Sequence, residues 1–148
     1  MSRPCRIVTH LLIALGMLWP PFTSAAQAPS ESSARRGEQL FDGDQPIKGM
    51  LPGHDEALPA FASKCINCHR TTSGPADSSQ IVLTRSALLF AASRRGGPPS
   101  RYELSSFCML LRTGIDPAQI IIVHTMPRYD LDDAQCLDLW NYVILPRD

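Results

Sequence analysis

The sequence Cys65-Ile66-Asn67-Cys68-His69 is the most informative stretch of this 148-residue chain. Two cysteines three positions apart, with a histidine directly after the second, form the pattern by which a c-type haem is attached to protein. Residues i and i+3 of a helical turn lie on one face, so both sulfurs can reach the two vinyl groups of one porphyrin. The motif therefore predicts one covalent haem c, held by Cys65 and Cys68, with His69 as the proximal ligand of its iron.

A thiol–disulfide centre or a zinc site is the alternative interpretation of the same cysteine pair. The histidine directly behind the pair and the exported character of the chain favour haem over both. No catalytic triad or acidic dyad is recognisable in the sequence, and one haem carries one electron at a time. The sequence therefore predicts that the protein is not an enzyme.

The N-terminal segment has the form of a secretory signal peptide. Arg3 and Arg6 precede an apolar run from Ile7 to Trp19, and prolines and small residues follow it. The run is thirteen residues long, whereas a membrane-spanning helix needs about twenty. A cleaved signal is therefore favoured over an uncleaved membrane anchor.

Cleavage is predicted after Ala26 or Ala28, because both offer small residues where the protease requires them. This divides the chain into a signal peptide, residues 1–28, and one periplasmic domain of ordinary size, residues 29–148. Loss of the two signal arginines leaves twelve Lys and Arg against fourteen Asp and Glu, a formal charge of −2. The absence of a basic stripe argues against nucleic acid as a partner, and no second hydrophobic span follows the signal.

Hydrophobic periodicity and capping residues predict an all-α domain of four or five short helices joined by long loops. The predicted segments are a helix from Ser33 to about Phe41, a helical turn over residues 60–69, a helix from Thr84 to about Ala92, a helix between a Ser100–Glu103 capping box and Gly114, and a last helix from Asp132 to Pro146. Residues 43–59 are rich in Gly, Pro and Asp and predict an irregular surface loop.

Cys108 and Cys136 are the cysteines of the mature domain that the haem motif does not use. Both fall on the apolar stripes of predicted helices, in a compartment where disulfides persist. A disulfide and two separate buried thiols both fit this placement, because the sequence does not fix the distance between the two Cα atoms. The sequence leaves the choice between them open.

A haem iron of this kind takes a second axial ligand from elsewhere in the chain, and Met with His is a common pair. Met126 is one candidate, because Pro127 restricts its backbone in a loop directly before the last helix. The other candidates are Met50, Met109, His54 and His124.

The chain resembles the class I monohaem cytochromes c of bacterial periplasms. The matching pieces are the first helix with Gly37 and Phe41, the motif from Cys65 to His69, the segment Leu111–Pro117, the segment Met126–Tyr129, and a last helix with Leu139, Trp140 and Tyr142. The resemblance implies a small cytochrome c fold wrapped around one haem. It also implies that the first and last helices cross at a small residue, so that Gly37 meets the Trp140 region.

The resemblance further implies the roles of the site residues. Cys65 and Cys68 form the thioethers, His69 is the proximal ligand, and Met126 is the distal ligand. Arg128 and Tyr129, directly after the Met-Pro pair, are candidates for hydrogen bonds to a haem propionate; the alternative is that they only anchor their loop.

These features predict a periplasmic one-electron carrier of a respiratory chain, with His/Met axial ligation that favours the ferrous state. The predicted partners are redox proteins: a periplasmic dehydrogenase, an oxidase or a membrane electron-transfer complex. Two alternatives stay open. One is a haem-based ligand-binding or sensing protein, and the other is a dedicated electron-accepting subunit of one periplasmic dehydrogenase.

Overall fold

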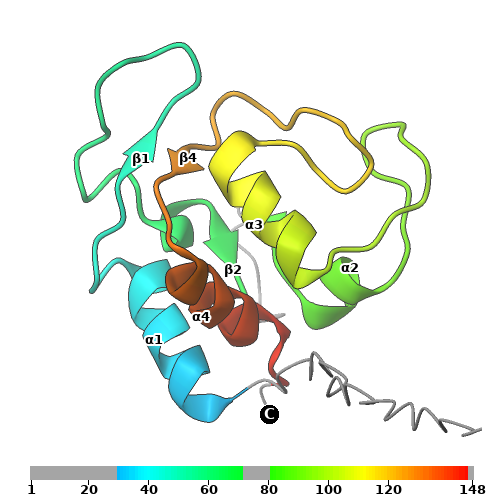
Figure 1. Ribbon diagram of the computed structural model, residues 1–148, viewed down its shortest axis with the longest axis horizontal. Coiled ribbons are helices and arrows are strands. Elements are labelled where there is room, and N and C mark those ends of the chain that lie inside the picture. The colour runs from blue at the N-terminus through cyan, green and yellow to red at the C-terminus, as the bar shows by residue number, and fades with distance from the viewer. Residues whose placement is uncertain (1–29, 72–80, 147–148) are drawn as a thin grey trace, which may run out of the picture.

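The computed structural model describes residues 30–71 and 81–146, so the predicted signal peptide, residues 1–28, lies outside the described residues. In chain order the elements are α1 (Glu31–Asp42), β1 (Gly49–Met50), the 3-10 helix η1 (Cys65–Asn67), β2 (His69–Arg70), β3 (Ile81–Val82), α2 (Arg85–Leu89), α3 (Leu104–Thr113), β4 (Arg128–Tyr129) and α4 (Asp133–Ile144). Figure 1 shows α1 and α4 side by side, with the long loops on the opposite side of the molecule. Within the two described ranges, none of the helices has the length and apolarity that crossing a membrane requires.

The first and last helices touch at Gly37. A Cβ atom added at Gly37 would lie 2.0 Å from the carbonyl oxygen of Asp138 and 2.7 Å from the Cβ atom of Tyr142. Beside this contact the rings of Phe41 and Tyr142 pack with their centroids 5.2 Å apart. Gly37 therefore meets α4 at the two residues that bracket Trp140, which is the contact that the sequence analysis expects.

A buried polar network joins the same two helices. The carboxylate of Asp138 accepts hydrogen bonds from Ser33 Oγ at 2.5 Å and from the Arg36 guanidinium at 2.7 and 2.8 Å. Asn141 Nδ2 in turn donates to Ser33 Oγ at 2.8 Å. Burial of a carboxylate is costly unless it is paired and hydrogen-bonded, so this network stabilises α1 on α4 only as a complete set.

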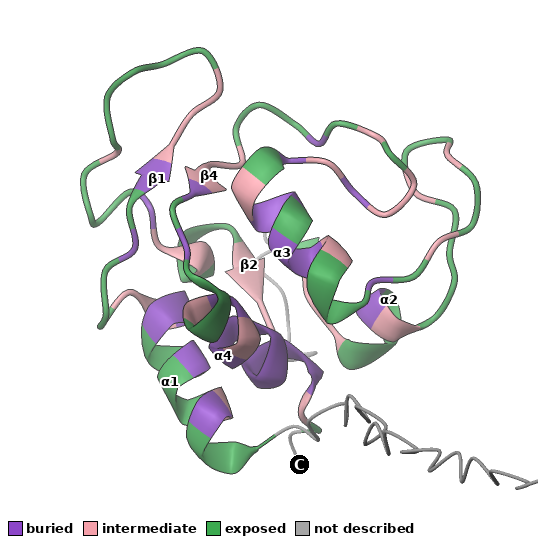
Figure 2. Cartoon of the chain, viewed as in Figure 1, coloured by how far each residue is buried: buried purple, intermediate pink, exposed green. Residues whose placement is uncertain are grey.

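The third helix packs on α4 through an aromatic pair and a disulfide. The ring centroids of Phe107 and Trp140 lie 5.3 Å apart. Cys108 and Cys136 form a disulfide with a Cα–Cα distance of 5.8 Å, and Cys136 is fully buried. The sequence leaves open a disulfide or two separate buried thiols, and the structure has the disulfide. Figure 2 shows that the buried faces of α1, α3 and α4 turn toward one another.

Reduction of this disulfide is expected to lower the free energy of unfolding by about 3 to 4 kcal/mol, because a cross-link of this loop length restricts the unfolded chain. The two cysteines are 28 residues apart. Urea unfolding with and without a dithiol reductant measures the difference. A Cys108→Ala/Cys136→Ala variant is the control, because the reductant should leave its unfolding midpoint unchanged. An equal effect of the reductant on both proteins would contradict the prediction.

The prediction of an all-α cytochrome fold was wrong. The described residues contain two two-stranded sheets beside the helices, so the fold mixes helices with small sheets. β1 pairs antiparallel with β4, Gly49 opposite Tyr129, and β2 pairs parallel with β3, His69 opposite Ile81. The physical reason is that loop backbone in the interior must satisfy its N–H and C=O groups, and pairing with another loop does so. The segment 43–59, predicted to be wholly irregular, contains β1.

Candidate functional site

The Cys65–His69 motif folds as a 3-10 turn that runs into a strand. Cys65–Asn67 form η1, and the N–H of Cys68 donates to the carbonyl of Cys65 at 3.1 Å. Cys65 is the first residue of η1 and Cys68 is its C-cap, so the two cysteines stand at the two ends of one turn. The helical turn predicted over residues 60–69 is therefore shorter and tighter than expected, and His69 already belongs to β2.

The two motif cysteines lie outside any disulfide, in contrast to Cys108 and Cys136. Cys65 is half-buried and packs against the hydrophobic core, whereas Cys68 is exposed. Burial raises the pKa of the Cys65 thiol to about 11, while the neighbouring Tyr129 acts in the opposite direction. One thiol thus faces the interior of the domain and the other faces solvent.

His69 presents a half-buried imidazole. Strand pairing holds its backbone, because the N–H of Ile81 donates to the carbonyl of Cys68 at 2.9 Å. Within the described parts of the chain, the buried Nδ1 atom of His69 has no hydrogen-bond partner. Burial lowers the pKa of His69, and the backbone of Ile81 acts against this shift. A neutral imidazole with an uncommitted ring nitrogen is the form that ligates metal.

Met126 lies in the turn before β4. Its N–H donates to the carbonyl of Val123 at 3.2 Å, and its half-buried side chain packs against the core. The other candidate ligands lie elsewhere: His54 and His124 are exposed, Met109 is exposed on α3, and Met50 is half-buried in β1. Of these five candidates, only Met126 packs against the hydrophobic core as the structure describes it.

The two residues of β4 have protein partners in the site. Tyr129 is 6% exposed and stands opposite Gly49 in the β1–β4 pair. Burial, the largest cause, raises the pKa of Tyr129. Arg128 donates to the carbonyl of Met126 at 2.6 Å and lies over Gly114, where an added Cβ atom would overlap its guanidinium. The propionate contacts of Arg128 and Tyr129 stay predictions.

Strand β1 lies between the attachment motif and the Met126 segment. A Cβ atom added at Gly49 would be 3.2 Å from Ser63 Cβ, 3.2 Å from Tyr129 Cε1 and 3.3 Å from Pro127 Cβ. Ser63, two residues before Cys65, is itself buried and donates to the carbonyl of Ile47 at 3.0 Å. The sequence does not predict this connection, because no local pattern links residues so far apart along the chain.

Three exposed apolar residues lie beside the motif that contains Cys68. Phe61, Ile66 and Ile81 are 73%, 41% and 58% exposed. They are neighbours of the motif, because Asn67 Nδ2 donates to the carbonyl of Phe61 at 2.8 Å and Ile81 pairs with the motif backbone. The motif thus has two thiols outside any disulfide, and the Nδ1 atom of His69 has no hydrogen-bond partner among the described residues. Together with the exposed apolar residues beside it, the motif has the groups that a covalently attached porphyrin needs.

A zinc site built from the motif has no support. In residues 30–71 and 81–146, no group of three or more His, Cys, Asp and Glu side chains is placed so that it could hold a metal ion. A structural zinc site usually takes four protein ligands. A haem iron takes only one imidazole and one thioether from the protein. The missing group of three ligands therefore argues against zinc but not against haem.

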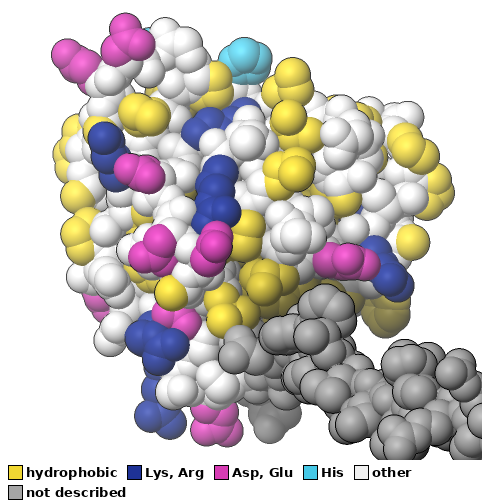
Figure 3. All heavy atoms as spheres, viewed as in Figure 1, with side chains coloured by type: hydrophobic (Ala, Val, Ile, Leu, Met, Phe, Trp, Pro, Cys, Tyr) yellow, Lys and Arg dark blue, Asp and Glu magenta, His cyan; other side chains and the backbone are white. Residues whose placement is uncertain are grey.

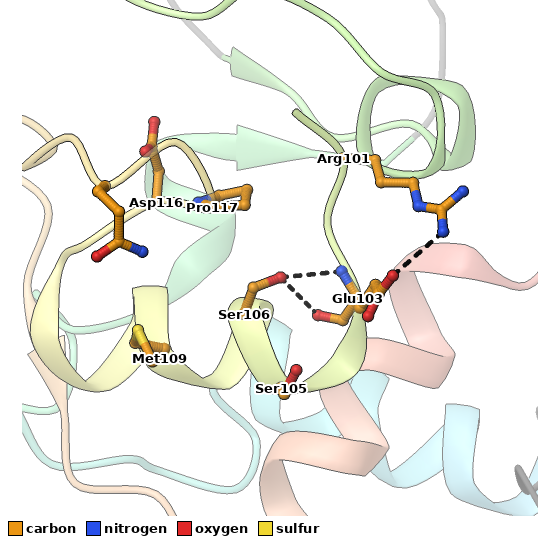
Figure 4. A pocket seen from close by; sticks show the side chains of 8 residues that line it. Arg101, Glu103, Ser105, Ser106, Met109, Asp116 and Pro117 are labelled. Atoms are coloured by element: carbon orange, nitrogen blue, oxygen red, sulfur yellow. Dashed lines mark hydrogen bonds and ion pairs between the residues drawn. The ribbon is translucent and has the colours of Figure 1, made fainter. Parts of the chain in front are cut away.

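A pocket of about 250 Å³ lies away from the motif, between the start of α3 and the turn at Asp116 (Figure 4). Its charged side chains already have partners. Arg101 pairs with Glu103 at 3.3 Å, and Asp116 accepts from the backbone N–H groups of Ala118 and Ile120, each at 2.9 Å. Met109 is the only candidate ligand that lines it, so the pocket offers no second candidate site.

No family model, no curated protein and no solved structure matches this chain. The interpretation of the site therefore rests on the chemistry and placement of its own residues.

Proposed function

We propose that this protein is a periplasmic one-electron carrier with a single covalently attached haem c. The proposal depends on one observation, the arrangement of the Cys65–His69 motif. Two unbridged cysteines share one 3-10 turn, and they are followed directly by a half-buried histidine with an uncommitted ring nitrogen. The proposed relation to class I monohaem cytochromes c rests on these residues and on Met126, and not on the fold class.

The proposed roles divide the site into attachment and ligation. Each thiol of Cys65 and Cys68 adds across one vinyl group, so that the sulfur bonds to one carbon and the hydrogen passes to the other. His69 offers its imidazole and Met126 its thioether as axial ligands. When bound, the haem supplies reversible one-electron chemistry between ferric and ferrous iron, and the protein tunes and presents it.

The chain holds these ligands on short paired segments. Strand β2 fixes the backbone of His69, and β4 together with Arg128 fixes the turn that carries Met126. Ligands that keep their positions in both oxidation states limit the rearrangement that accompanies electron transfer. Cys65 and Met126 also both pack against the hydrophobic core, which further restrains them.

The proposed partners are a periplasmic dehydrogenase, an oxidase or a membrane electron-transfer complex. Redox encounters use small and weak interfaces. The apolar surface of Phe61, Ile66 and Ile81 beside Cys68 is of the kind that such an encounter can use. Figure 3 shows charges of both signs interspersed over one face of the molecule, so that face offers no strongly charged docking surface.

Expression of the full chain in a bacterium that has a haem-attachment machinery tests the proposal. The secreted protein is expected to be red and to have the mass of the cleaved polypeptide plus one haem after denaturation. Its ferric spectrum should contain a weak sulfur-to-iron band in the far red, and a redox titration should be reversible with one electron. A colourless protein with the mass of bare polypeptide would contradict the proposal. Fast carbon monoxide binding by the ferrous form at neutral pH would contradict the carrier role and support sensing.

A further inference from the structure

Ser63 is a buried residue that joins the start of the attachment motif to the segment before β1. It lies two residues before Cys65 and is 4% exposed. Its hydroxyl donates to the carbonyl oxygen of Ile47 at 3.0 Å, and the carbonyl oxygen of Ala60 is a second acceptor at 3.2 Å. Ile47 is itself a buried residue of the core. A buried hydroxyl without a partner is costly, so Ser63 holds the segment around Ile47 in place.

The backbone that follows Ile47 is hydrogen-bonded to the strand that follows Met126. The carbonyl of Lys48 accepts the N–H of Asp130 at 2.9 Å, and the next residues form the antiparallel pair of β1 with β4. A pair of strands this short is only marginally stable by itself, so it depends on the contacts that hold its ends. The hydrogen bond of Ser63 to Ile47 fixes one of these ends.

Gly49 brings the same two segments together at a second point. A Cβ atom added there would lie 3.2 Å from Ser63 Cβ and 3.3 Å from Pro127 Cβ. Pro127 follows Met126 directly and restricts its backbone, and Arg128 donates to the carbonyl of Met126 at 2.6 Å. β1 therefore lies packed between Ser63 and the turn that carries Met126.

The motif side of this connection is held by other contacts. Gly43 is the C-cap of α1, and the side chain of Lys64 lies over it, since a Cβ atom added at Gly43 would be 2.5 Å from Lys64 Cγ. Cys65 packs against the hydrophobic core. The chain on both sides of Ser63 is thus anchored, and loss of the Ser63 hydroxyl would loosen β1 rather than the motif.

We propose that Ser63 is a positioning residue that, through its hydrogen bond to Ile47, holds β1 and with it the Met126 turn against the haem-attachment motif. This inference rests on the proposed function, because it concerns retention of Met126 as a ligand. It predicts that loss of the hydroxyl makes Met126 easier to displace from the iron, while both thioethers still form.

Ser63→Ala tests this role in the haem-loaded ferric protein at one fixed pH. Added imidazole displaces a methionine ligand, and loss of the far-red sulfur band reports the displacement. We expect imidazole to bind about tenfold more tightly to Ser63→Ala than to the wild type, because loss of one buried hydrogen bond raises the fraction of molecules with an open Met126 turn. Hydrogen exchange of the Asp130 amide should become faster by a similar factor, since it reports the contact with Lys48 independently of the iron.

Ser33→Ala is the matched control. Ser33 is also 4% exposed, and its hydroxyl donates to Asp138 Oδ1 at 2.5 Å, between α1 and α4. The variant loses the same buried group and should lose stability. Its imidazole affinity should equal that of the wild type, because Ser33 has no contact with β1 or with the Met126 turn in the part of the chain that the structure describes.

Gly49→Ala replaces Ser63→Ala if the latter does not fold. Its added Cβ presses on the Cβ atoms of Ser63 and Pro127, which cannot rotate away from the backbone. The strand must then move away from one of them, so the same tighter imidazole binding is expected.

The outcomes separate the two proposals. If the wild type carries haem and the sulfur band, but Ser63→Ala (or Gly49→Ala in its place) binds imidazole as the wild type does or exchanges the Asp130 amide no faster, the role of Ser63 is refuted and the proposed function stands. Equal tightening in Ser33→Ala also refutes the role, since loss of any buried serine hydroxyl would then act alike. Covalent haem without the sulfur band refutes the role of Ser63, because Met126 is then not the ligand. A wild type without covalent haem refutes both proposals.

Discussion

Replacement of Cys65 and Cys68 together by alanine is expected to abolish covalent haem attachment. They are the two cysteines of residues 30–71 and 81–146 that lie outside the disulfide, so no other cysteine of these residues is free to take over. In this variant only His69 and Met126 would hold the porphyrin, through their bonds to the iron. Denaturant breaks such bonds. Under denaturing conditions the variant should show the mass of bare polypeptide, whereas the wild type keeps its haem.

The second cysteine pair provides the control for this experiment. Cys108→Ala/Cys136→Ala removes the same number of sulfur atoms, but from a disulfide in the helical core. It should keep its haem and lose stability instead, by the amount expected for reduction. Haem that stays covalently bound without Cys65 and Cys68 would contradict the assignment of the thioethers. Equal loss of haem in both double variants would show that attachment fails for reasons of folding alone.

The helices were predictable in part, because some of their signals are local. The last helix begins at the predicted cap, where Asp132 and Gln135 form a capping box, and ends at Ile144, with Leu145 between it and Pro146. Gly114 ends α3 in the left-handed region, with φ 77°, where glycine is favoured. These signals lie within one turn of the helix ends, so the sequence contains them in full.

The predicted Ser100–Glu103 capping box was wrong: Glu103 is itself the cap of α3, and its N–H donates to Ser106 Oγ at 2.9 Å. The helix predicted from Thr84 to about Ala92 ends earlier, at Leu89.

The start of α1 shows where local signals become ambiguous. The sequence predicts the cap at Ser33, but Ser30 is the cap and accepts the N–H of Ser33 at 3.2 Å. Ser33 is needed elsewhere, because its hydroxyl donates to Asp138 on α4. Two serines three residues apart look equally suitable as caps, and only the tertiary partner of Ser33 distinguishes them.

The sheets were not predictable, because they pair residues far apart in the chain. A two-residue strand is too short to show the alternation by which strands are recognised. Gly49 pairs with Tyr129, and no local pattern in the sequence links these two positions. The ligand candidates show the same limit. The sequence could name five, and only the packing of Met126 on the core separates it from the other four.

Gly37→Ala is expected to cost about 3 kcal/mol of the free energy of unfolding, as overpacking at a tight contact does. The new Cβ would lie 2.0 Å from the carbonyl oxygen of Asp138, which is backbone and cannot rotate away. Alanine stabilises an isolated helix relative to glycine by only about 1 kcal/mol. The overlap costs more than this gain, so the substitution is expected to destabilise the protein. Relief requires α1 and α4 to separate, which also stretches the hydrogen bonds of Ser33 and Arg36 to Asp138.

Urea unfolding followed by far-ultraviolet circular dichroism measures this loss on the haem-loaded protein. Glu38→Ala is the matched control, because Glu38 is the next residue of α1, is exposed, and becomes the same alanine. Its effect should stay within about 0.5 kcal/mol, as is usual for surface sites. A Gly37→Ala protein as stable as the control would mean that α1 and α4 do not cross at Gly37. The buried network around Asp138 would then need another explanation, since it forms only where these helices are in close contact.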